Sequence, residues 1–210
     1  MNSTDKLPNA PKKWDTPNGH SPMANLANQF HPITDDTVKF IDEHTFKVFV
    51  LKGKYLLKPG DICEHIYFIQ KGAIRAFIKE GNKDITTWIT TENEMATSIR
   101  GFETQEPCLE NMQAIEDCEL VAASYKDLQH LYKTSLEMNI VARKLYEFYY
   151  RAAEERAYIS RLSKASSKYL HFVNTRGALL NRIPLKYIAS YLGMTIETLS
   201  RMRSKLVKKK

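Results

Sequence analysis

The chain has 210 residues, of which 43% are hydrophobic and 26% are charged, ordinary proportions for a globular protein. No apolar run approaches the ~20 residues that span a bilayer, and the start of the chain lacks an apolar signal core. We therefore expect a cytoplasmic protein without a membrane partner. Cys63, Cys108 and Cys118 are odd in number and widely spaced, which favours free thiols over a disulfide framework or a metal site.

Positive charge is concentrated at one end of the chain. The formal net charge is +7, yet residues 161–210 alone hold 12 Lys and Arg and one acidic residue, a net of +11. Residues 1–160 hold 19 basic and 23 acidic residues, a net of −4. A solvated tail of Lys208, Lys209 and Lys210 would explain only three of these charges. Such a basic segment is typical of phosphate contact in nucleic-acid-binding proteins.

The first 24 residues are rich in Pro, Asn, Asp and Lys and lack periodicity, so we predict a disordered N-terminal tail over 1–24. A short helix is expected from Asp35 to Glu43. Short strands with turns at close intervals follow, and they predict an antiparallel sandwich or barrel within residues 25–133. The predicted strands are Phe46–Leu51, His65–Ile69, Ala73–Lys79, Asp84–Thr90, Met112–Ile115 and Glu119–Ala123.

The pattern becomes helical over residues 134–162. Apolar residues at three-four spacing form a seam, interrupted at Glu155, and a seam of this length is typical of a helix that pairs two subunits. The alternative is one helix packed on its own domain. A second helix is expected from Lys164 to Thr175. The predicted dimer seam consists of Met138, Val141, Leu145, Phe148, Ala152 and Ile159.

Residues 163–210 are predicted to hold a helix-turn-helix. The first helix runs from Leu185 to Leu192, Gly193 supplies a left-handed turn, and Thr195 caps the second helix. Apolar side chains stand where the two helices must touch, namely Ile188, Ala189, Leu192, Met194, Leu199 and Met202. The outer face of the second helix, which enters the major groove in such motifs, remains polar. A helical hairpin unrelated to DNA is the alternative, and the local charge weighs against it.

Three motifs in this order resemble the CRP/FNR family of bacterial transcription regulators. They are Leu56–Asp61 (LLKPGD), Ile66–Gly72 (IYFIQKG) and Glu197–Arg201 (ETLSR). The resemblance implies an α+β fold with a cyclic-nucleotide-binding-like β-roll (a double-stranded β-helix), a dimerisation helix and a winged helix-turn-helix. It also implies a homodimer that binds a palindromic site in double-stranded DNA and acts on RNA polymerase. Four residues follow Leu206, so we expect the wing to be absent or reduced.

The family's effector sites are not reproduced. Members that bind cyclic AMP carry a Gly-Glu pair and an Arg-Ser pair, whose Arg neutralises the cyclic phosphate. Here Leu109, Glu110 and Asn111 stand where the Arg-Ser pair belongs, and Arg100 is only a conceivable substitute. No Cys precedes Cys63, as an iron–sulfur sensor requires, and His44 or His65 alone is weak support for haem. We predict no cofactor and no dependence on cyclic AMP, while an unidentified small-molecule effector remains possible.

The resemblance assigns DNA-contacting roles to the second helix. Glu197, Ser200 and Arg201 match the family's base-contacting positions, because Arg can pair with guanine and Glu can accept from cytosine. A half-site containing a GA step is expected. Glu197 and Arg201 are also spaced for an i,i+4 ion pair, a compatible alternative. Backbone contacts are expected from Lys186, Thr195, Thr198, Arg203, Lys205 and Lys208.

The sequence thus predicts a regulator and no enzyme, because no catalytic constellation, metal-spaced cluster or phosphate loop is present. The competing hypothesis is a ligand-sensing or interaction β-roll whose basic C-terminal helices bind DNA only non-specifically or not at all.

Overall fold

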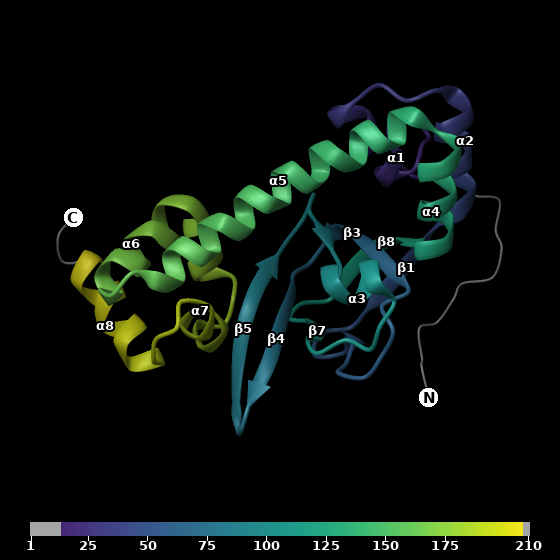
Figure 1. The fold of residues 1–210 in the computed structure, drawn as a ribbon. Coiled ribbons are helices and arrows are strands. Elements are labelled where there is room, and N and C mark those ends of the chain that lie inside the picture. The colour runs from purple at the N-terminus through teal and green to yellow at the C-terminus, as the bar shows by residue number, and fades with distance from the viewer. Residues whose placement is uncertain (1–13, 208–210) are drawn as a thin grey trace. The chain divides into compact units, whose positions relative to one another are not determined.

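The computed structural model describes residues 14–207, and its elements form an α+β fold. Figure 1 shows two groups of strands and a series of helices at the C-terminal end. The chain divides into two compact units, residues 14–76 with 90–147 and residues 77–89 with 148–207, which we call unit 1 and unit 2. The helices are α1 (Pro22–Phe30), α2 (Asp35–His44), α3 (Ile99–Thr104), α4 (Tyr125–Thr134), α5 (Leu136–Arg161), α6 (Ala165–Arg176), α7 (Leu185–Tyr191) and α8 (Ile196–Val207).

Two four-stranded antiparallel sheets form the β-roll. The strands are β1 (Thr45–Val50), β2 (Tyr55–Leu57), β3 (His65–Lys71), β4 (Ile74–Glu80), β5 (Lys83–Thr90), β6 (Met95–Ala96), β7 (Asn111–Ala114) and β8 (Cys118–Ser124). One sheet has the order β1-β8-β3-β6 and the other β2-β7-β4-β5. All six predicted strands are present, so the expected antiparallel sandwich or barrel is confirmed. The sequence patterns did not predict β2, β6, α3 or α4.

The register of the first sheet follows the alternation of its strands. In β1 and β8, Thr45 pairs with Ala123 and Val50 with Cys118. In β3 and β8, Tyr67 pairs with Ala122, and the register shifts between Ile69 and Lys71. Leu120, Val121 and Ala122 of β8 point to alternating faces and all are buried, so both faces of the sheet are covered at this strand. This strand is the centre of the unit 1 core.

The N-terminal segment is more ordered than its composition indicates. Trp14 is buried and its indole Nε1 donates to the carbonyl oxygen of Asp42, while the Asp42 carboxylate accepts from the backbone N–H of Ser21 at 2.6 Å. Ser21 then caps α1, whose Met23, Ala24 and Ala27 are buried. The predicted tail over 1–24 is therefore wrong for residues 14–24, and residues 1–13 lie outside the described part. The buried Trp14 side chain and the Ser21 N-cap order this segment despite its polar composition.

Glu137 joins the start of α5 to the start of α2. Its carboxylate accepts hydrogen bonds from the Thr34 hydroxyl at 2.8 Å and the Thr37 hydroxyl at 2.9 Å. Thr34 is itself the N-cap of α2, so the negative charge stands at the positive end of that helix. The hydrogen bonds from its own backbone N–H and from Thr34 and Thr37 lower the pKa of Glu137 to about 2.

We expect acid to weaken this link before other contacts of α2 are lost. The folded-state pKa of about 2 is below the ordinary 4.5, so the stabilisation is fully present above pH 4.5 and declines as pH falls toward 2. Glu137→Gln should cost about 0.5–1 kcal/mol at pH 7, since the carboxylate is partly exposed, and little at pH 2. Urea unfolding at both pH values measures this difference. Glu154→Gln, an exposed change on the same helix, should shift neither value; a Glu137→Gln cost that is equal at both pH values would contradict the link.

The first turns of α5 belong to the core of unit 1. Met138 and Val141 are buried, and they share one hydrophobic cluster with Met23, Ala27 and Ile41 of α1 and α2. Lys144 Nζ donates to the carbonyl oxygen of Phe30 at the C-terminus of α1, at 2.7 Å. The periodicity that predicted a dimer seam is accounted for, in this part of the helix, by packing on the chain's own domain.

Unit 2 has a helical core of its own. Phe172 of α6 and Ile188, Leu192 and Leu199 of α7 and α8 are almost completely buried. The Phe172 and Tyr191 rings meet edge to face with their centroids 5.9 Å apart. A short 3-10 helix, Gly177–Asn181, connects α6 to the segment before α7. Of the helices described, none has the length and apolar character that crossing a membrane requires.

Candidate DNA interface

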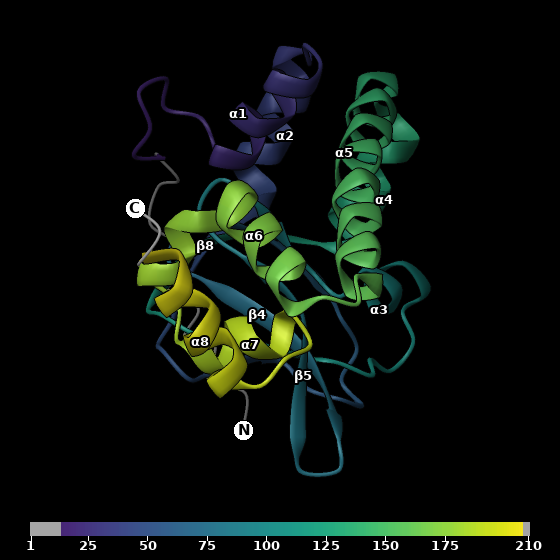
Figure 2. The same cartoon turned by 90° about the vertical axis from the view of Figure 1, so that its left-hand side faces the viewer.

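Helices α7 and α8 are joined by the tight turn that the sequence predicted. Gly193 has a φ of 61°, in the left-handed region that favours glycine, and the N–H of Met194 donates to the carbonyl oxygen of Ala189. The Thr195 hydroxyl accepts from the N–H of Thr198 at 3.2 Å, which caps α8. Figure 2, in which α8 faces the viewer beside α7, shows the pair as a compact helical hairpin.

The buried and exposed sides of α8 follow the predicted pattern. Leu199 is fully buried, as are Ile188, Ala189 and Leu192 in and next to α7, and Met194 and Met202 are half-buried. Glu197, Ser200 and Arg201 are exposed on the other side. The structure therefore brings the three predicted base-contacting residues onto one accessible helix face.

Glu197 is held by the N-cap. Hydrogen bonds from its own backbone N–H and from the Thr195 hydroxyl lower the pKa of Glu197, so the carboxylate is ionised at neutral pH. No ion pair joins it to Arg201 among the described residues, so the intrahelical pair that the spacing allowed is not formed. The Arg201 side chain is exposed to solvent.

The predicted backbone contacts differ in their surroundings. Lys186, Thr195 and Lys205 are exposed, and the Lys186 ammonium lies 4.9 Å from the centroid of the Tyr187 ring. Thr198 is half-buried. Arg203 donates from Nη2 to the Asn181 side chain at 3.0 Å, which ties α8 to the 3-10 helix. Lys208 lies outside the described residues, as do the other two lysines of the C-terminal run.

A contact that sequence patterns did not predict joins α7 to the β4–β5 hairpin within unit 2. The Ser190 hydroxyl accepts from the backbone N–H of Thr86 at 2.8 Å and donates to the carbonyl oxygen of Asp84 at 2.7 Å. Arg176 Nη1 donates to the carbonyl oxygen of Ile89 at 2.6 Å. Side chains of α6 and α7 thus form hydrogen bonds with backbone groups of the edge strand β5.

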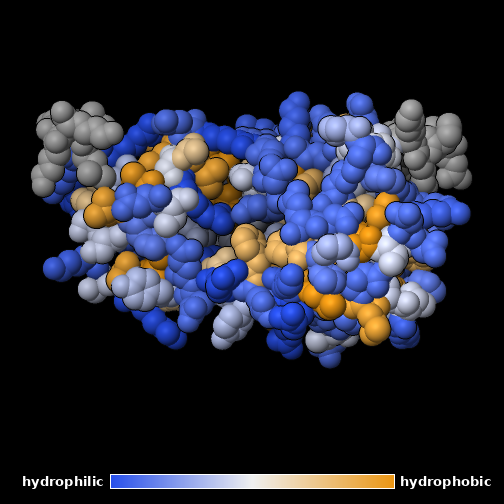
Figure 3. All heavy atoms as spheres, turned by 90° about the horizontal axis from the view of Figure 1, so that it is seen from above, coloured by the Kyte–Doolittle hydropathy of each residue, from blue (hydrophilic) through white to orange (hydrophobic). Residues whose placement is uncertain are grey.

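The residues of the seam predicted along α5 differ in how far they are buried. Met138, Val141 and Ile159 are buried within the single chain, while Leu145 and Ala152 are half-buried. Phe148 remains 44% exposed. Glu155, which interrupts the seam, accepts at 2.6 Å from the His171 ring of α6 in the same chain. Figure 3 shows hydrophobic residues in separate clusters among hydrophilic ones on the side viewed from above.

The stretch that corresponds to the phosphate cassette includes a short helix packed on the rest of unit 1. This is the six-residue helix α3, in which Phe102 is buried and packs edge to face on Tyr125. A Cβ at Gly101 would meet the Cys108 sulfur at 2.1 Å. Arg100, the conceivable substitute for the missing Arg, is exposed and lies 3.9 Å from the Glu106 carboxylate.

The β-roll contains a buried arginine outside the stretch that corresponds to the phosphate cassette. Arg75 of β4 is buried, and its guanidinium donates from Nε and Nη2 to the Gln113 side chain of β7, at 3.2 and 2.9 Å. Sequence reasoning did not single out Arg75. Its position on β4, away from α3, differs from that of the family's phosphate-binding Arg.

Comparisons with known proteins agree with this architecture. Residues 47–135 match the family described as cyclic nucleotide-binding domain. The sequence matches no curated protein. Solved structures do match. Because their sequence identity to this chain is low, the matches show a shared fold.

Three of these structures cover most of the chain. FixK2 from Bradyrhizobium japonicum is 19% identical, with a TM-score of 0.66 over 79% of this chain and 85% of the other. A regulator of the CRP/FNR family from Eubacterium rectale is 16% identical, with a TM-score of 0.69 over 88% of each chain. The c-di-GMP-responsive regulator CLP from Xanthomonas campestris is 16% identical, with a TM-score of 0.62 over 84% and 93% of the two chains.

Proposed function

We propose that this chain, which contains a cyclic nucleotide-binding domain and has the fold of the CRP/FNR transcription regulators, is a homodimeric, sequence-specific DNA-binding regulator that does not depend on cyclic AMP. The observation that carries the proposal is the exposed face of α8. There Glu197, Ser200 and Arg201 stand on a capped helix within the most basic segment of the chain.

The physical basis for specificity is the chemistry of that face. An exposed guanidinium can donate two hydrogen bonds to guanine O6 and N7, and an ionised carboxylate can accept from cytosine N4. Lys186, Lys205 and the lysine run after α8 would contact phosphates, which gives affinity without specificity. Contact with RNA polymerase would follow from binding beside a promoter.

Independence from cyclic AMP is supported by the residues of α3. A cyclic phosphate needs a cation and free N–H groups, whereas α3 offers an exposed Arg100 beside a carboxylate and a Gly101 packed on Cys108. Adding cyclic AMP to the full chain should therefore leave its DNA affinity unchanged.

Selection from random duplex DNA with the full-length protein tests the function. We expect enrichment of a palindrome whose half-sites contain a GA step, with centres one helical turn, ~34 Å, apart. Binding that shows no enrichment over the starting pool would support the competing hypothesis, a β-roll module whose basic helices bind DNA non-specifically.

The dimer is proposed to form through the part of the α5 seam that the chain leaves exposed. Phe148→Asp should convert the protein to a monomer in light scattering and weaken binding to a palindrome, because it places a charge in an apolar contact. Ala157→Asp, an exposed change off the seam on the same helix, should leave the dimer intact. If Phe148→Asp remained dimeric, the contact between subunits would lie elsewhere.

A further inference from the structure

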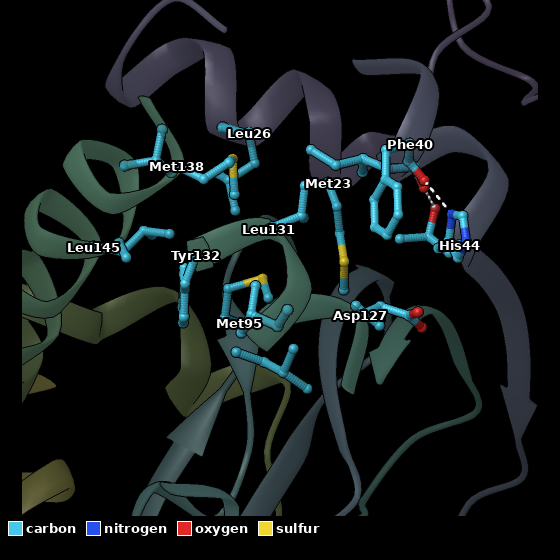
Figure 4. Close-up of a pocket in the computed structure, with 18 residues that line it drawn as sticks. Met23, Leu26, Phe40, His44, Met95, Asp127, Leu131, Tyr132, Met138 and Leu145 are labelled. Atoms are coloured by element: carbon cyan, nitrogen blue, oxygen red, sulfur yellow. Dashed lines mark hydrogen bonds between the residues drawn. The ribbon is translucent and has the colours of Figure 1, made fainter. Parts of the chain in front are cut away.

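An apolar cavity of about 90 Å³, partly open to solvent, lies in unit 1, and its lining includes no residue of α3. It is lined by side chains of α1, α2, α4, the first turns of α5 and one face of the β1-β8-β3-β6 sheet. Figure 4 shows Met138 and Leu145 at one end of it, and Phe40, His44 and Asp127 at the other. Met23 and Met95 approach the middle from the helices above and the strands below.

Three of the polar groups at the cavity already have hydrogen-bond partners in the protein. His44 Nδ1 bonds to the carbonyl oxygen of Phe40 at 2.8 Å, and the Thr45 hydroxyl donates to the carbonyl oxygen of Ile41 at 2.6 Å. The Asp127 carboxylate accepts from the Ser124 hydroxyl at 2.5 Å. Burial and the nearby Glu103 raise the pKa of Tyr132 to about 12, so this residue stays neutral. Because a well-ordered water needs two to four polar partners, the apolar part of this space offers little to hold one.

We propose that this cavity binds a small, neutral, predominantly apolar molecule, of the size of one aromatic ring or a short aliphatic chain. An enclosed apolar cavity of ~150 Å³ binds benzene, and this smaller, partly open cavity offers the same kind of apolar surface. Three of its lining residues are methionines, whose flexible side chains adapt to ligands of different shape. A charged ligand is disfavoured, because no cation lines the cavity among the described residues and the carboxylate of Asp127 is already hydrogen-bonded.

The proposed site shares no residue with the proposed DNA contact. Met138, Val141, Ala142 and Leu145 of α5 line the cavity, so an occupant would add contacts between this helix and the rest of unit 1. By linkage, a ligand that binds only the folded chain raises its stability. The expected signature is a melting temperature that rises with ligand concentration.

The methionines provide a direct test in the full-length protein. With methyl-¹³C-labelled methionine, benzene and 1-hexanol are titrated separately while methyl resonances are followed. Saturable shifts are expected for Met23, Met95 and Met138, which line the cavity. Met112, Met194 and Met202 lie outside it and serve as internal controls. Equal shifts of all methionine methyls would overturn the proposal. The absence of any saturable shift would also overturn it, because the cavity would then hold neither ligand in solution.

Two variants test the location. Ala142→Leu fills the cavity from α5 and should abolish the saturable shifts, whereas Ala157→Leu, the same change at an exposed position of this helix, should retain them. If Ala142→Leu does not fold, Leu145→Phe at a half-buried lining position replaces it. Undiminished binding by a folded cavity-filling variant would place the ligand elsewhere.

Discussion

Arg201→Ala is expected to weaken binding to the selected palindrome by ~1–3 kcal/mol per half-site, about 5-fold to 150-fold. The loss should be confined to sites that carry guanine at one position of the half-site, because the exposed guanidinium can pair with that base alone. Affinity for random DNA should change far less. Quantitative gel shifts with the cognate site and with sites substituted at each base pair measure both effects.

Lys205→Ala provides the matched control for this prediction. Lys205 is also exposed in α8, but we assign it to a phosphate, so all sequences should lose affinity alike and the slope of log K against log salt should fall by about one. Should Arg201→Ala show this same uniform pattern, Arg201 would be a phosphate contact and the proposed recognition of guanine would be wrong.

The helix-turn-helix could be predicted from sequence because its determinants are local. Gly193 is needed for a left-handed turn, Thr195 for a cap, and buried residues at three-four spacing for the crossing of two helices. Each acts within a few residues in the chain. The same holds for the strands, whose alternation and turns predicted the antiparallel roll.

The features that were missed depend on distant partners. Trp14 is ordered by the carbonyl oxygen of Asp42, 28 residues away, and composition alone contains no trace of that bond. The Ser190 hydroxyl accepts a hydrogen bond from the N–H of Thr86 in β5, which is 104 residues away in the sequence. The seam of α5 has the same periodicity whether it packs on a second subunit or on α1 and α2, so periodicity could not assign Met138 and Val141 to the chain's own core.

Gly72→Ala should strongly destabilise the roll. Gly72 ends the IYFIQKG motif with a φ of 101°, and a Cβ there would lie 2.6 Å from the carbonyl oxygen of Asp117 and 2.7 Å from the Cys118 sulfur. Alanine must therefore accept a left-handed backbone and displace β8, the central strand of the core. We expect a loss of about 3 kcal/mol or more in the free energy of unfolding, measured from urea midpoints at an unchanged slope.

Gly53→Ala separates the two causes. Gly53 also has a left-handed backbone, with a φ of 84°, but nothing lies within 4 Å of an added Cβ. Its substitution should cost only the conformational part, ~1–2 kcal/mol. The excess at Gly72 then measures how tightly β3 and β8 are held where the register shifts between Ile69 and Lys71. Equal losses at both glycines would mean that β8 yields freely there, and the motif glycine would then be required for its backbone conformation alone.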